Sequence, residues 1–168
     1  MAVNTDPRLQ NQVIYSIYVR NHTEEGTFRA VIGDLDRIRA LGTDIIWLMP
    51  IHPIGVEGKK GTLGCPYANR DYRTVNPAYG TMDDFKALMS EIHAHGMKCM
   101  IDVVYNHTSP DSVLYAEHPE FFYCGKNGKP GNKTVSPHRY TMCHGGTVGT
   151  GKSKTQTQMH EFASCFFT

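Results

Sequence analysis

Apolar residues recur along residues 13–49 with two different periods. Residues 13–19 and 44–49 are short runs rich in β-branched and aromatic residues, which is typical of strands. Between them, an apolar stripe with helical spacing begins after Thr27, a common helix-capping residue, and ends before Gly42, which can terminate a helix. The stripe consists of Phe28, Val31, Leu35 and Ile38. A strand, one amphipathic helix and a second strand are therefore predicted.

A second helix and a third strand are predicted over residues 81–104. Residues 81–84 resemble a capping box in which an acid replaces the usual Glu or Gln. The apolar stripe that follows consists of Phe85, Leu88, Met89 and Ile92 and ends before Gly96. Residues 97–104 then form an apolar run that contains one carboxylate, Asp102. Such a run predicts a strand that is buried on both faces of a parallel sheet.

Strands that alternate with helical crossovers pair in parallel, so the pattern predicts an α/β fold. Two architectures fit it: a doubly wound open sheet, or the first part of an eight-stranded β/α barrel. No G-x-G-x-x-G motif follows the first strand, which argues against the dinucleotide-binding version of the open sheet. The Gly- and Pro-rich loop over residues 51–80 is too long for a plain connector. In a barrel, this loop would lie on the catalytic face.

Composition narrows the class of protein without naming a function. The 168 residues suit one domain of ordinary size, with 40% apolar residues, 20% charged residues and a net charge of +1. No basic stripe indicates nucleic acid, and no apolar run has the length of a membrane span. The start lacks a secretory signal pattern, and the five cysteines form no C-x-x-C pair, so we expect reduced thiols in a cytoplasmic protein.

Four short motifs follow one another between residues 46 and 107. Residues 46–51 read IWLMPI, residues 67–72 read YANRDY, residues 79–85 read YGTMDDF and residues 102–107 read DVVYNH. In this order, they resemble the second strand, the loop after it, the entry to the second helix and the end of the third strand of the α-amylase family (glycoside hydrolase family 13). The resemblance covers roughly residues 13–119.

The resemblance implies a fold and an activity. The fold would be a TIM-type (β/α)8 barrel, of which this chain holds an incomplete first part, about three β/α units, followed by an irregular C-terminal tail. The parent activity would be that of a glycoside hydrolase or transglycosidase acting on α-glucosidic bonds by a retaining mechanism. The partner would be an α-glucan or α-glucoside.

The resemblance also implies roles for individual residues. His107 would hydrogen-bond the sugar on the non-reducing side of the scissile bond, and Tyr67 would stack on that sugar. Asp102 would lie at the floor of the site beside a basic residue of a later strand. Asn106 resembles the position that ligates a structural calcium ion in many members. An aromatic face and hydrogen-bond donors suit a sugar.

Each role has a structural alternative. His107 could be a loop histidine whose hydrogen bonds are satisfied, and Tyr67 could simply cover the mouth of a barrel. Asp102 could be a buried acid held by a cation, which is a common scaffold element whose loss destabilises a protein.

No catalytic residue is identified in the sequence. Retaining glycosidases use two carboxylates about 5 Å apart. In the family that the motifs resemble, the nucleophile follows the fourth strand and the general acid follows the fifth, whereas three strands are predicted in this chain. We therefore expect a truncated piece that lacks activity alone and that self-associates or aggregates through open sheet edges.

The composition changes at about residue 134. Residues 134–168 contain no Leu, Ile or Asp and a single Glu, Glu161. We therefore divide the chain into residues 1–133, the barrel part, and residues 134–168, an atypical tail that is disordered or frame-shifted. The frameshift hypothesis fails if no other reading frame of the gene restores a fourth strand.

A second motif lies in this tail. Residues 146–153, from Gly146 to Ser153, read GTVGTGKS and fit the phosphate-binding P-loop, with Lys152 on the terminal phosphates. The preceding residues 136–144 do not form the apolar strand that this motif requires. A nucleotide-binding protein and a non-catalytic sugar-binding remnant are thus the alternatives to the glycosidase interpretation.

Overall fold

The computed structural model describes residues 6–123 and 140–141. The chain divides into two compact units. The first unit comprises residues 1–53 and 72–103, and the second comprises residues 54–71 and 104–168. Among the described residues, no helix combines the length and the apolar character that a membrane crossing requires.

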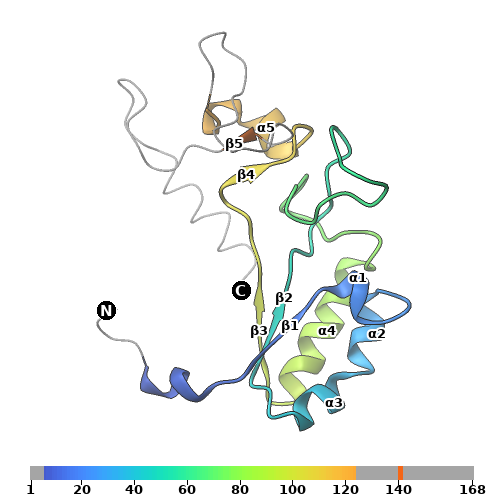
Figure 1. Ribbon diagram of the computed structural model, residues 1–168, viewed down its shortest axis with the longest axis vertical. Helices are drawn as coiled ribbons and strands as arrows, with labels where there is room; N and C mark the ends of the chain where they lie inside the picture. Colours follow the sequence, from blue (N-terminus) through green and yellow to red (C-terminus); the bar gives the residue numbers. More distant parts are fainter. Residues whose placement is uncertain (1–5, 124–139, 142–168) are drawn as a thin grey trace. The chain divides into compact units, whose positions relative to one another are not determined.

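The first unit contains a three-stranded parallel sheet in the order β1-β2-β3 (Figure 1). Its strands are β1 (Ile14–Ile17), β2 (Ile45–Leu48) and β3 (Lys98–Ile101). The register aligns Ile17 with Leu48, and Leu48 with Ile101. The three predicted strands and their parallel pairing are confirmed, although each strand is shorter than the apolar run that predicted it.

The described residues of the first unit contain one helix before β1 and four helices between the strands. They are the 3-10 helix η1 (Pro7–Asn11) and the α-helices α1 (Val19–His22), α2 (Phe28–Ile32), α3 (Leu35–Ala40) and α4 (Met82–Ala94). The single helix predicted after Thr27 is divided into α2 and α3. Gly33 is the C-cap of α2, and Asp34 is the N-cap of α3. The predicted stripe nevertheless persists across this break, since all four of its residues are fully buried.

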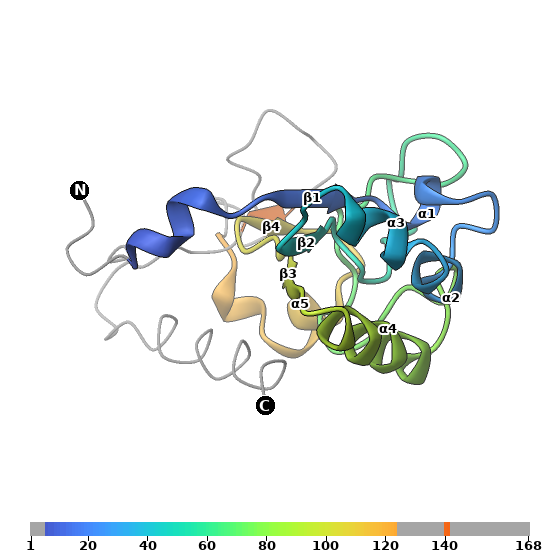
Figure 2. The same cartoon turned by 90° about the horizontal axis from the view of Figure 1, so that it is seen from below.

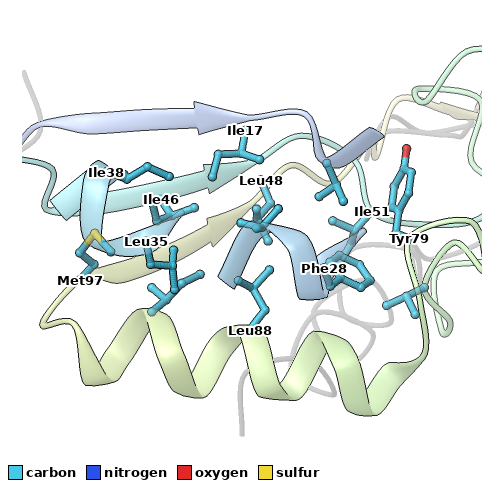
Figure 3. Close-up of a cluster of buried hydrophobic side chains, with 14 residues drawn as sticks. Ile17, Phe28, Leu35, Ile38, Ile46, Leu48, Ile51, Tyr79, Leu88 and Met97 are labelled. Carbon is cyan, nitrogen blue, oxygen red and sulfur yellow. The ribbon is translucent and has the colours of Figure 1, made fainter. Parts of the chain in front are cut away.

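The core of the first unit lies between the sheet and the helices α2, α3 and α4. Figure 2 shows these helices together on one side of the strands, and Figure 3 shows their apolar side chains meeting those of the sheet. The fully buried members include Ile17, Phe28, Leu35, Ile38, Ile46, Leu48 and Leu88. Burial of apolar side chains is the main term that stabilises such a layer.

The opposite face of the sheet carries exposed apolar side chains. Ile14 is 51% exposed, Trp47 is 37% exposed and Met100 is 39% exposed. Side chains alternate between the two faces of a strand, so these residues face away from the helices. The prediction that the third strand is buried on both faces is therefore wrong for the described part of the chain, where helices cover one face. Self-association through this sheet stays a prediction.

The start of α4 is fixed by a capping box. The Thr81 hydroxyl accepts a hydrogen bond from the Asp84 amide at 3.2 Å, and the Asp84 carboxylate accepts one from the Thr81 amide at 2.8 Å. Arg29 of α2 donates to the same carboxylate at 2.5 Å. The predicted cap, in which an acid replaces Glu or Gln, is thus confirmed. The hydrogen bond from Arg29 also connects α4 to α2.

The second unit has short elements. They are β4 (His107–Thr108), α5 (Val113–Glu117), the 3-10 helix η2 (Pro119–Phe121) and β5 (Tyr140–Thr141). β4 and β5 pair antiparallel, with His107 opposite Thr141. α5 begins after Ser112, whose hydroxyl accepts a hydrogen bond from the Tyr115 amide at 3.1 Å.

Truncation of Leu48 to alanine is expected to destabilise the first unit. Leu48 is 0% exposed, so Leu48→Ala should lower the free energy of unfolding by about 2–5 kcal/mol. The control Leu41→Ala, at a residue that is 59% exposed, should change it by about 0.5 kcal/mol or less. Urea unfolding followed by the fluorescence of Trp47 measures both, and equal losses in the two variants would contradict this packing.

The cap of α4 is expected to make stability depend on pH in acid. The hydrogen bond from the Thr81 amide, followed by the bond from Arg29, lowers the pKa of Asp84 from 3.8 to about 2. A lowered pKa in the folded state stabilises the fold above about pH 4, and this stabilisation is lost as the pH falls through about 2. The difference in unfolding free energy between wild type and Asp84→Asn should therefore shrink from pH 6 to pH 2. A constant difference would contradict the role of the carboxylate.

Candidate functional site

The residues that the resemblance assigns to sugar binding, and Asn106, which it assigns to calcium, fall in both units. Tyr67, Asn106 and His107 belong to the second unit, whereas Asp102 belongs to the first. Each group is therefore described within its own unit.

Asp102 directly follows β3. Its amide donates to the Leu48 carbonyl at 2.8 Å, so the parallel ladder continues by one residue beyond the strand. The alternation of side chains places Asp102 in the same row as Met100, on the face of the sheet away from the helices. The residue is half-buried, and its carboxylate makes no hydrogen bond or ion pair within the described ranges 6–123 and 140–141. Its role at the floor of a sugar site stays a prediction.

Tyr67 occupies a tight turn. The Ala68 amide donates to the Cys65 carbonyl at 2.9 Å, which closes a β-turn with Pro66 and Tyr67 at its two central positions. Proline at the first central position pre-sets the backbone for such a turn. Tyr67 is half-buried, as expected for an amphipathic ring that shields apolar surface and keeps its hydroxyl near water.

His107 lies in β4 and is 8% exposed. The side-chain amide of Asn106 donates to His107 Nδ1 at 3.0 Å. The two side chains are thus hydrogen-bonded to each other. A histidine ring nitrogen can donate to or accept from a sugar hydroxyl, depending on the tautomer.

Backbone hydrogen bonds join the segment that carries Tyr67 to the segment that carries His107. The Ser109 amide donates to the Asn69 carbonyl at 2.9 Å, and the Val113 amide donates to the Arg70 carbonyl, also at 2.9 Å. Asn69 lies two residues after Tyr67, and Ser109 lies two residues after His107. These bonds therefore hold the backbone segments of Tyr67 and His107 side by side.

A second set of bonds centres on Asp111. Its carboxylate accepts hydrogen bonds from the Val56 amide at 3.0 Å and from the Ser109 hydroxyl, and it lies 3.5 Å from Arg70 Nε. Burial alone would raise the pKa of Asp111, but the hydrogen bonds from Ser109 and Val56 and the charge of Arg70 hold it below its usual value. The carboxylate is thus kept charged. A Cβ atom at Gly55 would overlap the Ser109 side chain, so this close approach requires glycine.

The sequence does not reveal the hydrogen bonds and the ion pair of Asp111. Ser109 and Asp111 are ordinary loop residues by composition, and their partners Gly55, Val56 and Arg70 lie some forty to fifty-five positions away. Neither periodicity nor a motif brings such residues together. Asn69 also escapes sequence reasoning, although it is 1% exposed and its side-chain oxygen has no hydrogen-bond partner within the described part of the chain.

The calcium prediction rests on Asn106 alone. Calcium takes six to eight oxygen ligands, often from several carboxylates. Among the described residues, no group of three or more His, Cys, Asp or Glu side chains could hold a metal ion. Asn106 alone does not make a site, and the calcium prediction stays untested.

Two further predictions lie outside the described residues. The P-loop match with Lys152 falls there, as does the proposed division at residue 133 apart from the two-residue strand β5. Both stay predictions.

Comparisons with known proteins point to one family. A family model for the α-amylase catalytic domain matches residues 12–165. The trehalose-6-phosphate hydrolase of Escherichia coli (strain K12) is 31% identical over 166 residues, which cover 92% of this chain and 28% of that protein. The oligo-1,6-glucosidase of Parageobacillus thermoglucosidasius is 32% identical over 139 residues, which cover 74% of this chain and 24% of that protein.

Solved structures agree. An α-amylase from Lactobacillus plantarum aligns with a TM-score of 0.78 and 55% identity, over 80% of this chain and 32% of that one. A maltogenic α-amylase from Thermotoga neapolitana aligns with a TM-score of 0.83 and 35% identity, over 94% of this chain and 36% of that one. The chain spans between 24% and 36% of the length of these four relatives. The predicted fold class, the first part of a β/α barrel, is confirmed. On its sequence and its structure alike, this chain belongs to the α-amylase family, whose catalytic domain it matches.

Proposed function

We propose that this chain is part of a glycoside hydrolase or transglycosidase that acts on α-glucosidic bonds by a retaining mechanism. Within that enzyme, its described residues would bind the sugar on the non-reducing side of the scissile bond. The observation that carries this proposal is the pairing of the Tyr67 segment with the His107 segment through the Asn69–Ser109 hydrogen bond.

The chemistry of the two residues suits a sugar. A tyrosine ring offers an apolar face to the C–H surface of a pyranose, and its hydroxyl offers a polar edge. His107 offers a ring that is buried and held by Asn106, and imidazole nitrogens can hydrogen-bond sugar hydroxyls. An aromatic platform and a hydrogen-bonding ring on two connected segments are the elements of a small carbohydrate subsite.

The names of the relatives support the substrate class. They include a trehalose-6-phosphate hydrolase, an oligo-1,6-glucosidase and two α-amylases. We assign a binding role to this chain and no catalytic role to any of its carboxylates, because retaining hydrolysis needs two carboxylates about 5 Å apart and no such pair is identified in the sequence.

Maltose is expected to bind through these two residues. Tyr67→Ala and His107→Ala should each weaken maltose binding by roughly fivefold or more, since a stacking contact or a hydrogen bond is worth about 1 kcal/mol. Tyr67→Phe should retain most of the affinity because it keeps the ring. NMR titration of the full chain measures the dissociation constants.

The matched control is His118→Ala. The His118 ring stacks on Phe121 and pairs with Glu120. This variant should bind maltose as the wild type does. An equal loss of affinity in His118→Ala and His107→Ala would show that general destabilisation, not a sugar contact, explains the effect.

The chain alone is expected to release no reducing ends from starch, with or without added calcium, because none of its carboxylates is assigned to the reaction. Reducing-sugar release by the purified chain tests this expectation. Activity that disappears in His107→Ala would contradict it, and would show that two carboxylates complete a catalytic site in this protein.

A further inference from the structure

The loop that presents Tyr67 has two arms, and both are held near Asp111. Gly55 and Val56 belong to the first arm, and Asn69 and Arg70 belong to the second. The arms pair with each other through the Gly55 amide, which donates to the Ala68 carbonyl at 2.9 Å. Next to this pairing, Ile54 and Asn69 form an isolated antiparallel bridge. Tyr67 therefore lies between two arms that are hydrogen-bonded to each other.

Asp111 is bonded to both arms at once. On the first arm, it accepts a hydrogen bond from the Val56 amide at 3.0 Å. On the second arm, Arg70 Nε lies 3.5 Å from the same carboxylate oxygen. The other oxygen accepts from the Ser109 hydroxyl, and the Ser109 amide in turn bonds the Asn69 carbonyl. One carboxylate thus connects the Tyr67 loop to the segment that follows His107.

Because Asp111 is partly buried, the loss of its hydrogen bonds would be costly. Its side chain is 23% exposed and that of Arg70 is 51% exposed, so the carboxylate is partly buried while water still reaches the guanidinium. Removal of a partly buried acceptor leaves its donors unsatisfied, which costs more than the bond itself contributes. The tight fit of Ser109 and Asp111 against Gly55 leaves no room for a side chain there. A cluster packed this closely can hold a loop in one arrangement.

We propose that Asp111 is a positioning residue of the sugar site, which holds the Tyr67 loop at a fixed distance from His107. The inference deepens the proposed function and rests on it, because it assumes that Tyr67 and His107 bind one sugar. Asp111 itself does not contact the sugar. Its loss should reduce sugar affinity by letting the two contacts move apart, since a misplacement of about 1 Å is enough to weaken a binding site severely.

The test compares three substitutions in the full chain by NMR titration with maltose. Asp111→Ala removes all three bonds and should weaken maltose binding by about tenfold or more. Asp111→Asn should stay within about threefold of wild type, because its oxygen can accept from the Val56 amide while its amide donates to the Ser109 hydroxyl, which can also accept. Rescue by asparagine would assign the effect to the hydrogen bonds.

Asp84→Ala is the control for a purely structural carboxylate. Asp84 caps α4 and pairs with Arg29 in the first unit, so its loss should lower the melting temperature without changing the affinity for maltose. Asp111→Ala should instead show a large loss of affinity for a comparable change in melting temperature. If Asp111→Ala does not fold, Ser109→Ala takes its place, because it removes one bond to the carboxylate and should weaken binding at least threefold.

The outcomes separate this inference from the function on which it rests. Wild-type affinity in Asp111→Ala or in Ser109→Ala, with binding still lost in His107→Ala, would overturn the positioning role and leave the sugar site intact. Equal losses of affinity in Asp84→Ala and Asp111→Ala would also overturn it, since destabilisation would then explain both. No maltose binding by the wild type would overturn the proposed sugar site and the positioning role together.

Discussion

Burial of one face of the parallel sheet by α2, α3 and α4 is the interaction on which the first unit depends. Parallel strands cannot be joined by hairpins, so each connection must cross over and carries a helix back across the sheet. The apolar stripes of these helices then meet the alternate residues of β1, β2 and β3. The position of Asp102 follows from this packing, because the residue after β3 is fixed by the ladder that holds the strand.

Polar contacts connect the described segments of the second unit, which also bury Phe121 and Phe122. Asn69, His107, Thr108, Ser109 and Ser112 are all buried. Buried polar groups are tolerated where they bond one another, and such networks specify one arrangement of loops more sharply than apolar contacts do. Asp111 adds a charged acceptor to this network, and its lowered pKa reflects the donors that surround it. The hydrogen bonds of this network also hold the loop that carries Tyr67.

The apolar layer of the first unit and the polar cluster of the second unit suit different tasks. An apolar layer tolerates changes that conserve volume, and it supplies a stable support. A polar cluster fixes direction, because hydrogen bonds depend on angle as well as distance. The sugar contacts proposed for Tyr67 and His107 would need direction more than support. The hydrogen bonds of Asp111, Ser109 and Asn69 would supply it through groups that the substrate need not touch.

The sequence by itself determined the strands, the helical stripes and the cap of α4, because each is a local pattern of side chains a few residues apart. The motifs at residues 67–72 and 102–107 also sufficed to indicate the family. Only the tertiary structure decided that Gly33 and Asp34 divide one helix, that the sheet is covered on one face within the described residues, and that Asp111 reaches Val56 across 55 positions. Contacts between distant residues depend on how chain segments pack, and local side-chain periodicity carries no information about that.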